Sequence, residues 1–150
     1  MDTSGDISME DAAQGSQETS QKAIPKGHEI RSITIKAPPF SYIHLELIDS
    51  SSSPRKTGLD DLTVKSYITA ALTQFLGLTG SAISVDILKV EERECWIRVP
   101  REDLSPVVAA LGGWVGGDEQ EGQVAWRVRG KGSWLNVLVA NKDTSKIWEA

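Results

Sequence analysis

Aromatic and basic side chains occupy every second position in parts of two predicted strands. Their types suit recognition better than catalysis. Tyr42 and His44 lie on one of these strands, and Trp96 and Arg98 lie on the other. Aromatic rings can stack on RNA bases while arginines hold phosphates, and Trp, Tyr and Arg also dominate the binding energy of protein interfaces. The four residues therefore predict a binding surface for a protein or an RNA.

Basic residues recur near the C-terminal end of the chain. Alternation along a further predicted strand points Arg127 and Arg129 to the same face as Trp96 and Arg98. Phosphate binding draws on clustered lysines and arginines. Arg127, Arg129 and Lys131 are therefore candidates for a position close to RNA.

No residues form a recognisable catalytic or metal-binding arrangement. The single cysteine, Cys95, lies in an apolar strand and is expected to be inert core. His28 and His44 have no neighbours at metal-ligand spacing, and helix capping explains the adjacent carboxylates Asp60 and Asp61. The glycines between 112 and 117 match no phosphate-binding or dinucleotide motif. The sequence thus predicts neither an enzyme nor a cofactor.

The elements that must position these residues can be counted outward from a predicted hairpin. Residues 83–90 and 94–99 are predicted strands joined by the polar turn 91–93. An amphipathic helix begins at Asp60 or Asp61 and ends at Gly77 or Gly80. A second helix begins at Ser105–Pro106, or a turn earlier at Asp103, and ends before Gly112.

Two more strands complete the pattern. Residues 33–36 are extended and are interrupted by Pro38–Pro39, after which residues 40–48 alternate between apolar and polar. Residues 124–129 form the last strand, and the segment after Lys131 is predicted to be a closing helix or an extra strand. The serine-rich segment 49–58 is a predicted loop.

The resulting order βαββαβ predicts an α/β (α+β) sandwich of the ferredoxin-like or RRM-like type. Its four-stranded antiparallel sheet has the order 4-1-3-2, with both helices on one face. The opposite face is then open and carries Tyr42, His44, Trp96 and Arg98. In the alternative, Trp96 lies beneath the C-terminal segment, which covers this face within one chain.

Composition divides the chain into a tail and one domain. Residues 1–27 hold five acidic and two basic residues and no aromatic residue, which predicts a disordered acidic tail. Residues 28–150 form a single domain with a Gly-rich acidic loop at 112–123. The chain has a net charge of −5 and lacks a secretory signal and any apolar stretch of bilayer length, so a reducing, intracellular location is expected.

Four blocks in the right order resemble a known family. Residues 35–45, 64–68, 75–80 and 94–103 are similar to the fungal Pop-eight subunit of ribonuclease P and ribonuclease MRP, a family related to the Pop-five subunit. The resemblance runs from about residue 33 to residue 139 and omits the tail. The acidic tail and the Gly-rich insert between residues 114 and 123 depart from the family pattern.

This resemblance implies a non-catalytic protein subunit of a ribonucleoprotein whose RNA performs the cleavage. Such particles process the 5′ ends of precursor tRNA and precursor ribosomal RNA in the nucleus and nucleolus. The implied partners are a Pop-five-type subunit, an Rpp-one-type subunit and, mostly indirectly, the particle's RNA. The resemblance supplies no catalytic residues.

Two other functions fit the same sandwich. An independent single-stranded RNA-binding module would use the aromatic surface directly, although residues 28–150 carry a net charge of −2. An acylphosphatase-like or small-molecule-binding domain would need a phosphate-cradling loop after the first long strand. The segment 50–55 lacks glycine at the required turn, which disfavours this function.

Overall fold

The computed structural model describes residue 27 and residues 30–51, 58–118 and 122–148, with side chains described as far as residue 142. The chain divides into a unit that ends at Ile35 and a second unit of residues 36–150. Within the first unit, residues 30–35 have no regular secondary structure. The expected extended piece at 33–36 is therefore not a strand, and the predicted tail at 1–27 lies almost wholly outside the described residues.

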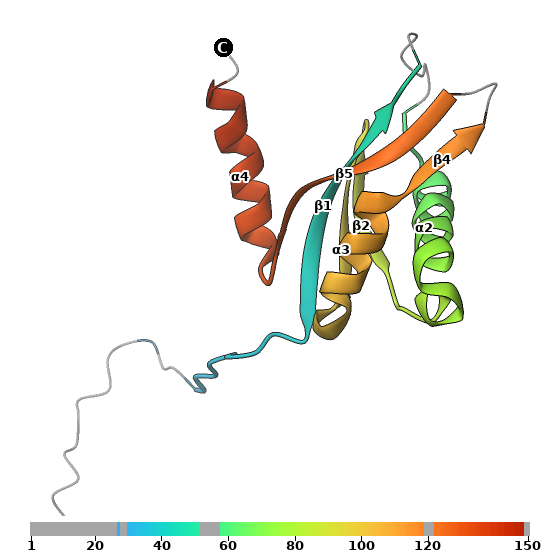
Figure 1. Cartoon of the computed structure of the whole chain (residues 1–150). Coiled ribbons are helices and arrows are strands. Elements are labelled where there is room, and N and C mark those ends of the chain that lie inside the picture. Colours follow the sequence, from blue (N-terminus) through green and yellow to red (C-terminus); the bar gives the residue numbers. More distant parts are fainter. Residues whose placement is uncertain (1–26, 28–29, 52–57, 119–121, 149–150) are drawn as a thin grey trace, which may run out of the picture. The chain divides into compact units, whose positions relative to one another are not determined.

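The described residues of the second unit form one antiparallel five-stranded sheet and three α-helices (Figure 1). The elements in chain order are β1 (Phe40–Asp49), α2 (Asp61–Ser81), β2 (Asp86–Glu91), β3 (Glu94–Pro100), a short 3-10 turn (Arg101–Asp103), α3 (Leu104–Gly113), β4 (Val115–Asp118), β5 (Gly122–Gly132) and α4 (Leu135–Trp148). The strand order is β2-β3-β1-β5-β4. None of the described helices is both long and apolar enough to pass through a bilayer.

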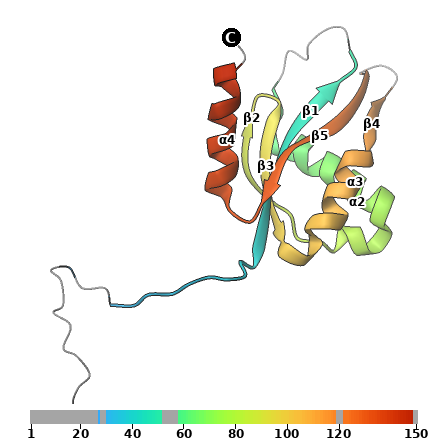
Figure 2. The same cartoon turned by 60° about the vertical axis from the view of Figure 1, so that its left-hand side comes forward.

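The helices cover both faces of this sheet. Figures 1 and 2 show α2 and α3 against one face, called the inner face here, and α4 against the opposite, outer face. The predicted α+β class is therefore confirmed, but the prediction of four strands with two helices was wrong in detail. The strand that was not predicted is β4, which extends one edge of the sheet. The helix that was not placed is α4, which contacts β5 and β1 on the face that was expected to be open.

Alternation along the strands builds the core against the inner face. A strand that places every second side chain inward buries those side chains between the sheet and amphipathic helices. On the inner face, the buried apolar residues of the three central strands are those predicted from the sequence, with Val128 packed at their margin: Ile43, Leu45, Leu47, Cys95, Ile97, Val99, Val124 and Trp126. Opposite them lie Val64, Ile68, Ala71, Leu72, Val107, Ala110 and Leu111 of α2 and α3.

Capping and one glycine determine the course of α2. The Asp60 carboxylate accepts a hydrogen bond of 3.3 Å from the backbone N–H of Thr63, which confirms the predicted cap. Gly77 has φ +63°, a left-handed conformation that L side chains seldom adopt, and kinks the helix there. Because the chain resumes helical geometry after this residue, α2 runs on to Ser81 and β2 begins only at Asp86.

The Gly-rich segment contributes to an edge hairpin and is not the single acidic loop predicted for 112–123. Val115–Asp118 forms β4, which pairs with β5 from Gly122 onward, while residues 119–121 lie outside the described part of the chain. A Cβ atom on Gly116 would lie 2.1 Å from Cζ2 of the buried Trp114 side chain. Gly116 is therefore required by packing, because only glycine leaves room for the indole ring.

A β-bulge interrupts the pairing of β1 with β5. Leu45 pairs with Val128 and His44 pairs with Gly130, so Arg129 is the extra residue between them. Side chains of directly paired residues share a face. Beyond the bulge Lys131 pairs with the buried Ile43, which places Lys131 on the inner face.

Candidate binding surface on the outer sheet face

The predicted aromatic cluster forms, but it is buried. The rings of His44 and Trp96 stack with their centroids 4.4 Å apart and an interplanar angle of 9°. His44 is 6% exposed and Trp96 is 4% exposed. Both residues point away from the inner core, so the burial comes from the outer face and its helix α4.

One lysine of α4 closes this face over the indole. Lys142 Nζ lies 4.8 Å from the centroid of the Trp96 ring, 2.7 Å from Glu94 Oε2 and 3.0 Å from Glu91 Oε2. A cation over an indole face and two carboxylates at the β2–β3 hairpin together anchor the helix. The covered arrangement, considered as the alternative on sequence grounds, is thus the one found.

Burial favours the neutral form of the His44 imidazole at neutral pH. Burial lowers the pKa of His44, and the Glu94 carboxylate, 3.6 Å from His44 Nε2, offsets this only in part. Burial alone would raise the pKa of Glu94, but the hydrogen bond from Lys142 holds this pKa below its usual value. The same hydrogen bond raises the pKa of Lys142. Glu94 and Lys142 therefore remain a charged pair beside a neutral histidine.

The indole ring has no free face for a nucleic-acid base. Trp96 pairs with His44 of β1 on one side and with Lys89 of β2 on the other, and Lys89 Nζ lies 5.6 Å from the ring centroid. RNA-recognition modules need aromatic rings that lie open on the sheet surface. This geometry disfavours an independent RNA-binding module that stacks bases on Trp96.

Two ring nitrogens in this buried cluster, His44 Nε2 and Trp96 Nε1, have no hydrogen-bond partner within the described chain. An unpaired buried donor or acceptor costs free energy comparable to a lost hydrogen bond. Apolar packing and the Lys142 ion pairs must therefore hold α4 against this cost.

The other two predicted site residues lie beside the cluster and are partly exposed. Tyr42 pairs with Arg98 across β1 and β3. Arg98 donates to Asp86 Oδ2 from Nη2 at 2.8 Å and from Nε at 3.0 Å, and its guanidinium lies 4.5 Å from the Phe40 ring centroid. The structure thus brings all four residues onto one face, but only Tyr42 and Arg98 remain accessible there. Their role in partner binding stays a prediction.

The predicted basic group is divided by the β5 bulge. Arg127 and Arg129 lie on the outer face, where Nη1 of each is 3.5 Å from Glu46 Oε2. Lys131 is exposed but lies on the inner face, as its pairing with Ile43 shows. Strict alternation could not reveal this division, because the sequence carries no clear signal of an inserted residue.

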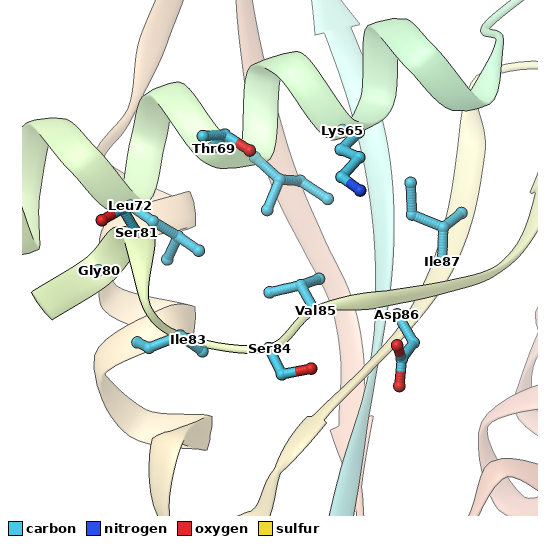
Figure 3. A pocket seen from close by; sticks show the side chains of 11 residues that line it. Lys65, Thr69, Leu72, Gly80, Ser81, Ile83, Ser84, Val85, Asp86 and Ile87 are labelled. Atoms are coloured by element: carbon cyan, nitrogen blue, oxygen red, sulfur yellow. The ribbon is translucent and has the colours of Figure 1, made fainter. Parts of the chain in front are cut away.

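A groove of about 340 Å³ lies between α2 and the segment that leads into β2 (Figure 3). Val85 and Ile87 point toward the helix, and Lys65 points from the helix toward the strand, whereas Asp86 points away. Since Asp86 is committed to Arg98, the lining offers no nucleophile with a base and an orienting group. The groove therefore gives no support to catalysis.

Sequence reasoning missed the charged residues that secure the outer face. Glu94 and Lys142 lie 48 positions apart, and Asp86 lies 12 positions before Arg98. The pairing of Asp86 with Arg98 follows from the hairpin register, so it could have been found by counting. No periodic signal links Glu94 to a lysine on a distant helix.

Metal and thiol chemistry receive no support from the geometry. No group of three or more potential metal-binding side chains occurs in the described part of the chain. Burial raises the pKa of the Cys95 thiol to about 12, so the reactive thiolate is scarce at neutral pH. This agrees with the expectation that Cys95 is an inert core residue.

Comparisons with known proteins add to this picture. Residues 39–114 match the sequence model of the family described as ribonucleases P/MRP protein subunit Pop8. A comparison with curated protein sequences found no match. The fold is similar to one chain in the cryo-EM structure of yeast ribonuclease MRP, with a TM-score of 0.61 and 15% identity, over 75% of this chain and 97% of that chain.

Proposed function

Since this chain belongs to the Pop8 family of ribonuclease P/MRP subunits, we propose that it is a non-catalytic subunit that supports the particle through its surfaces. The match over residues 39–114 covers the strand pair β1 and β3, both inner helices and the hairpin, and it is the observation that carries this proposal. Processing of precursor tRNA and ribosomal RNA is the activity of such particles. Cleavage itself would rest with the RNA.

The chemistry of the described residues agrees with a supporting role. The one thiol is buried and protonated, the one histidine in the sheet is buried and neutral, and the groove beside α2 has no catalytic set. A subunit that acts by binding needs none of these groups to react. The proposed partners are a Pop-five-type and an Rpp-one-type subunit, and the proposed location is the nucleus and nucleolus.

Purification of the tagged full-length chain from its own cells tests this function. We expect the RNA of ribonuclease P, ribonuclease MRP or both to co-purify, together with subunits of the two proposed types. Recovery of the chain without either RNA would contradict the proposal. Imaging of the tagged chain checks the nuclear and nucleolar location separately.

Two matched variants then locate the protein interface. Tyr42→Ala with Arg98→Ala alters the accessible part of the outer face. Phe75→Ser with Leu78→Ser alters α2, where these apolar side chains are 48% and 89% exposed. The double variant that no longer binds a partner subunit shows which of the two surfaces is the interface. Truncation of a central anchor residue costs about 2 kcal/mol or more of binding free energy, so the loss should be measurable.

A further inference from the structure

Two guanidinium groups of β5 converge on one carboxylate oxygen. Arg127 and Arg129 each approach Glu46 Oε2 to 3.5 Å, and their side chains are 53% and 36% exposed. A good charge-assisted N–H···O bond is about 2.7–2.9 Å long. Both contacts are therefore loose, and two cations share one anion at a surface open to solvent.

The other cations of the outer face are held more closely. Lys89 lies 3.2 Å, Arg98 2.8 Å and Lys142 2.7 Å from its nearest carboxylate oxygen. Among the described residues of this face, the loosely held positive charge is therefore concentrated at Arg127 and Arg129. The bulge limits this charge to the two arginines, because it places Lys131 on the inner face.

We propose that Arg127 and Arg129 together bind one phosphodiester group of the particle's RNA, and that this group displaces Glu46 from between them. The proposal rests on the proposed function, which supplies the RNA. Glu46 Oε2 marks the point on which both guanidiniums already converge. A phosphodiester offers two charged oxygens there, so each arginine can form its own charge-assisted bond.

An RNA fits this site better than an acidic protein segment. A partner's carboxylate would only replace Glu46, a carboxylate that the chain already holds in place. RNA gains in addition from the release of condensed counterions. Because phosphate contacts carry no sequence information, the site would position the RNA strand and would not read its bases.

Crosslinking in the assembled particle tests this site with the full-length chain. Particles that contain the tagged chain and RNA substituted with 4-thiouridine are irradiated, and the RNA attached to this chain is quantified and mapped to peptides. The variants are Arg127→Gln with Arg129→Gln, and Glu46→Gln. The matched control is Lys131→Gln, which removes a cation from the same strand but from the opposite face.

We expect wild-type crosslinks within β1 and β5 and a loss of about tenfold in the double arginine variant, since that variant loses its phosphate contact. Lys131→Gln should crosslink as the wild type does. Glu46→Gln should crosslink at least as strongly, because the competing carboxylate is gone. Protein composition of the purified particle, measured in the same samples, should not change.

Four results would overturn the proposal. The wild-type chain could lack crosslinks in β1 and β5, or the double arginine variant could crosslink as the wild type does. The double variant could instead lose a protein subunit at unchanged crosslinking, which would assign the site to an acidic protein segment. Glu46→Gln could also lose crosslinking as strongly as the double variant. Unchanged co-purification of the RNA would leave the proposed function standing in each case.

Discussion

The imidazole of His44 stacks in parallel on the indole of Trp96, and this pair forms a small second core between the sheet and α4. The larger core lies on the inner face, under α2 and α3. The sheet is therefore packed on both sides, and the residues first expected at a binding surface help to hold the fold together.

The stability of this second core should depend on the protonation of His44. Burial lowers the pKa of His44 below its ordinary value of 6.5, so below pH 6.5 the unfolded chain takes up a proton more readily than the folded chain. The free energy of unfolding should therefore fall as the pH falls from 6.5 toward the lowered pKa. Glu94, Lys142 and Arg129 are the charged groups that act on this imidazole.

Urea unfolding at pH 7.5 and pH 5.5 measures this dependence. His44→Phe keeps an aromatic ring on Trp96 but removes the titrating group, so the difference between the two pH values should shrink in this variant. An equal difference in His44→Phe and in the wild type would assign the pH dependence to other groups.

Lys142→Met should loosen α4 without unfolding the rest of the chain. The variant loses the ion pairs to the hairpin carboxylates, and partly exposed pairs of this kind contribute up to about 1 kcal/mol. Amide hydrogen exchange should become faster in residues 135–142 and stay unchanged in α2. Lys65→Met removes an exposed lysine elsewhere and should leave both helices unchanged.

Trp96→Ala should destabilise the whole fold. Removal of a buried tryptophan costs about 3–5 kcal/mol, which is a large part of the stability of a domain of this size. Chemical denaturation should show a correspondingly lower midpoint, and Trp96→Phe should fall between this variant and the wild type. A midpoint of Trp96→Ala close to that of the wild type would mean that α4 does not bury the ring in solution.

Gly116→Ala should be costly, although it adds a single methyl group. The new Cβ would lie 2.1 Å from Cζ2 of Trp114, so the buried indole would have to move, at about 1–3 kcal/mol. Gly112→Ala is the matched control, because its Cβ meets nothing within 4 Å and the residue lies in α3. We expect Gly112→Ala to be neutral or to stabilise by up to about 1 kcal/mol.

Local patterns predicted the inner core well. Ile43, Leu45 and Leu47 are buried as their alternation indicated, and Asp60 caps α2 as its type and position indicated. These features depend on neighbours within a few residues of one another along the chain. The family, assigned from short blocks of residues, is likewise confirmed by the match over 39–114.

The outer face was harder to predict because its structure depends on distant parts of the chain. Trp96 is covered by α4, whose Lys142 lies over the ring, and no pattern in β3 contains that information. The division of Arg129 from Lys131 depends on one unpaired residue in a strand whose sequence still alternates. Gly116 was assigned to a loop because glycine is common in loops. Its packing against the indole of Trp114 depends on the conformation of that side chain, which the sequence does not show.

The bulge at Arg129 acts as a shift of half a period in an otherwise regular two-residue repeat. It makes the sign and strength of the charge on each side of β5 a property of backbone register as well as of composition. Deletion of Arg129 would remove the bulge and leave Gly130 paired with His44 and Lys131 paired with Ile43, so Lys131 would stay on the inner face and the outer face would lose one arginine. One inserted residue thus adds a positive charge to the outer face and leaves the residues after it on the faces that they would occupy without it.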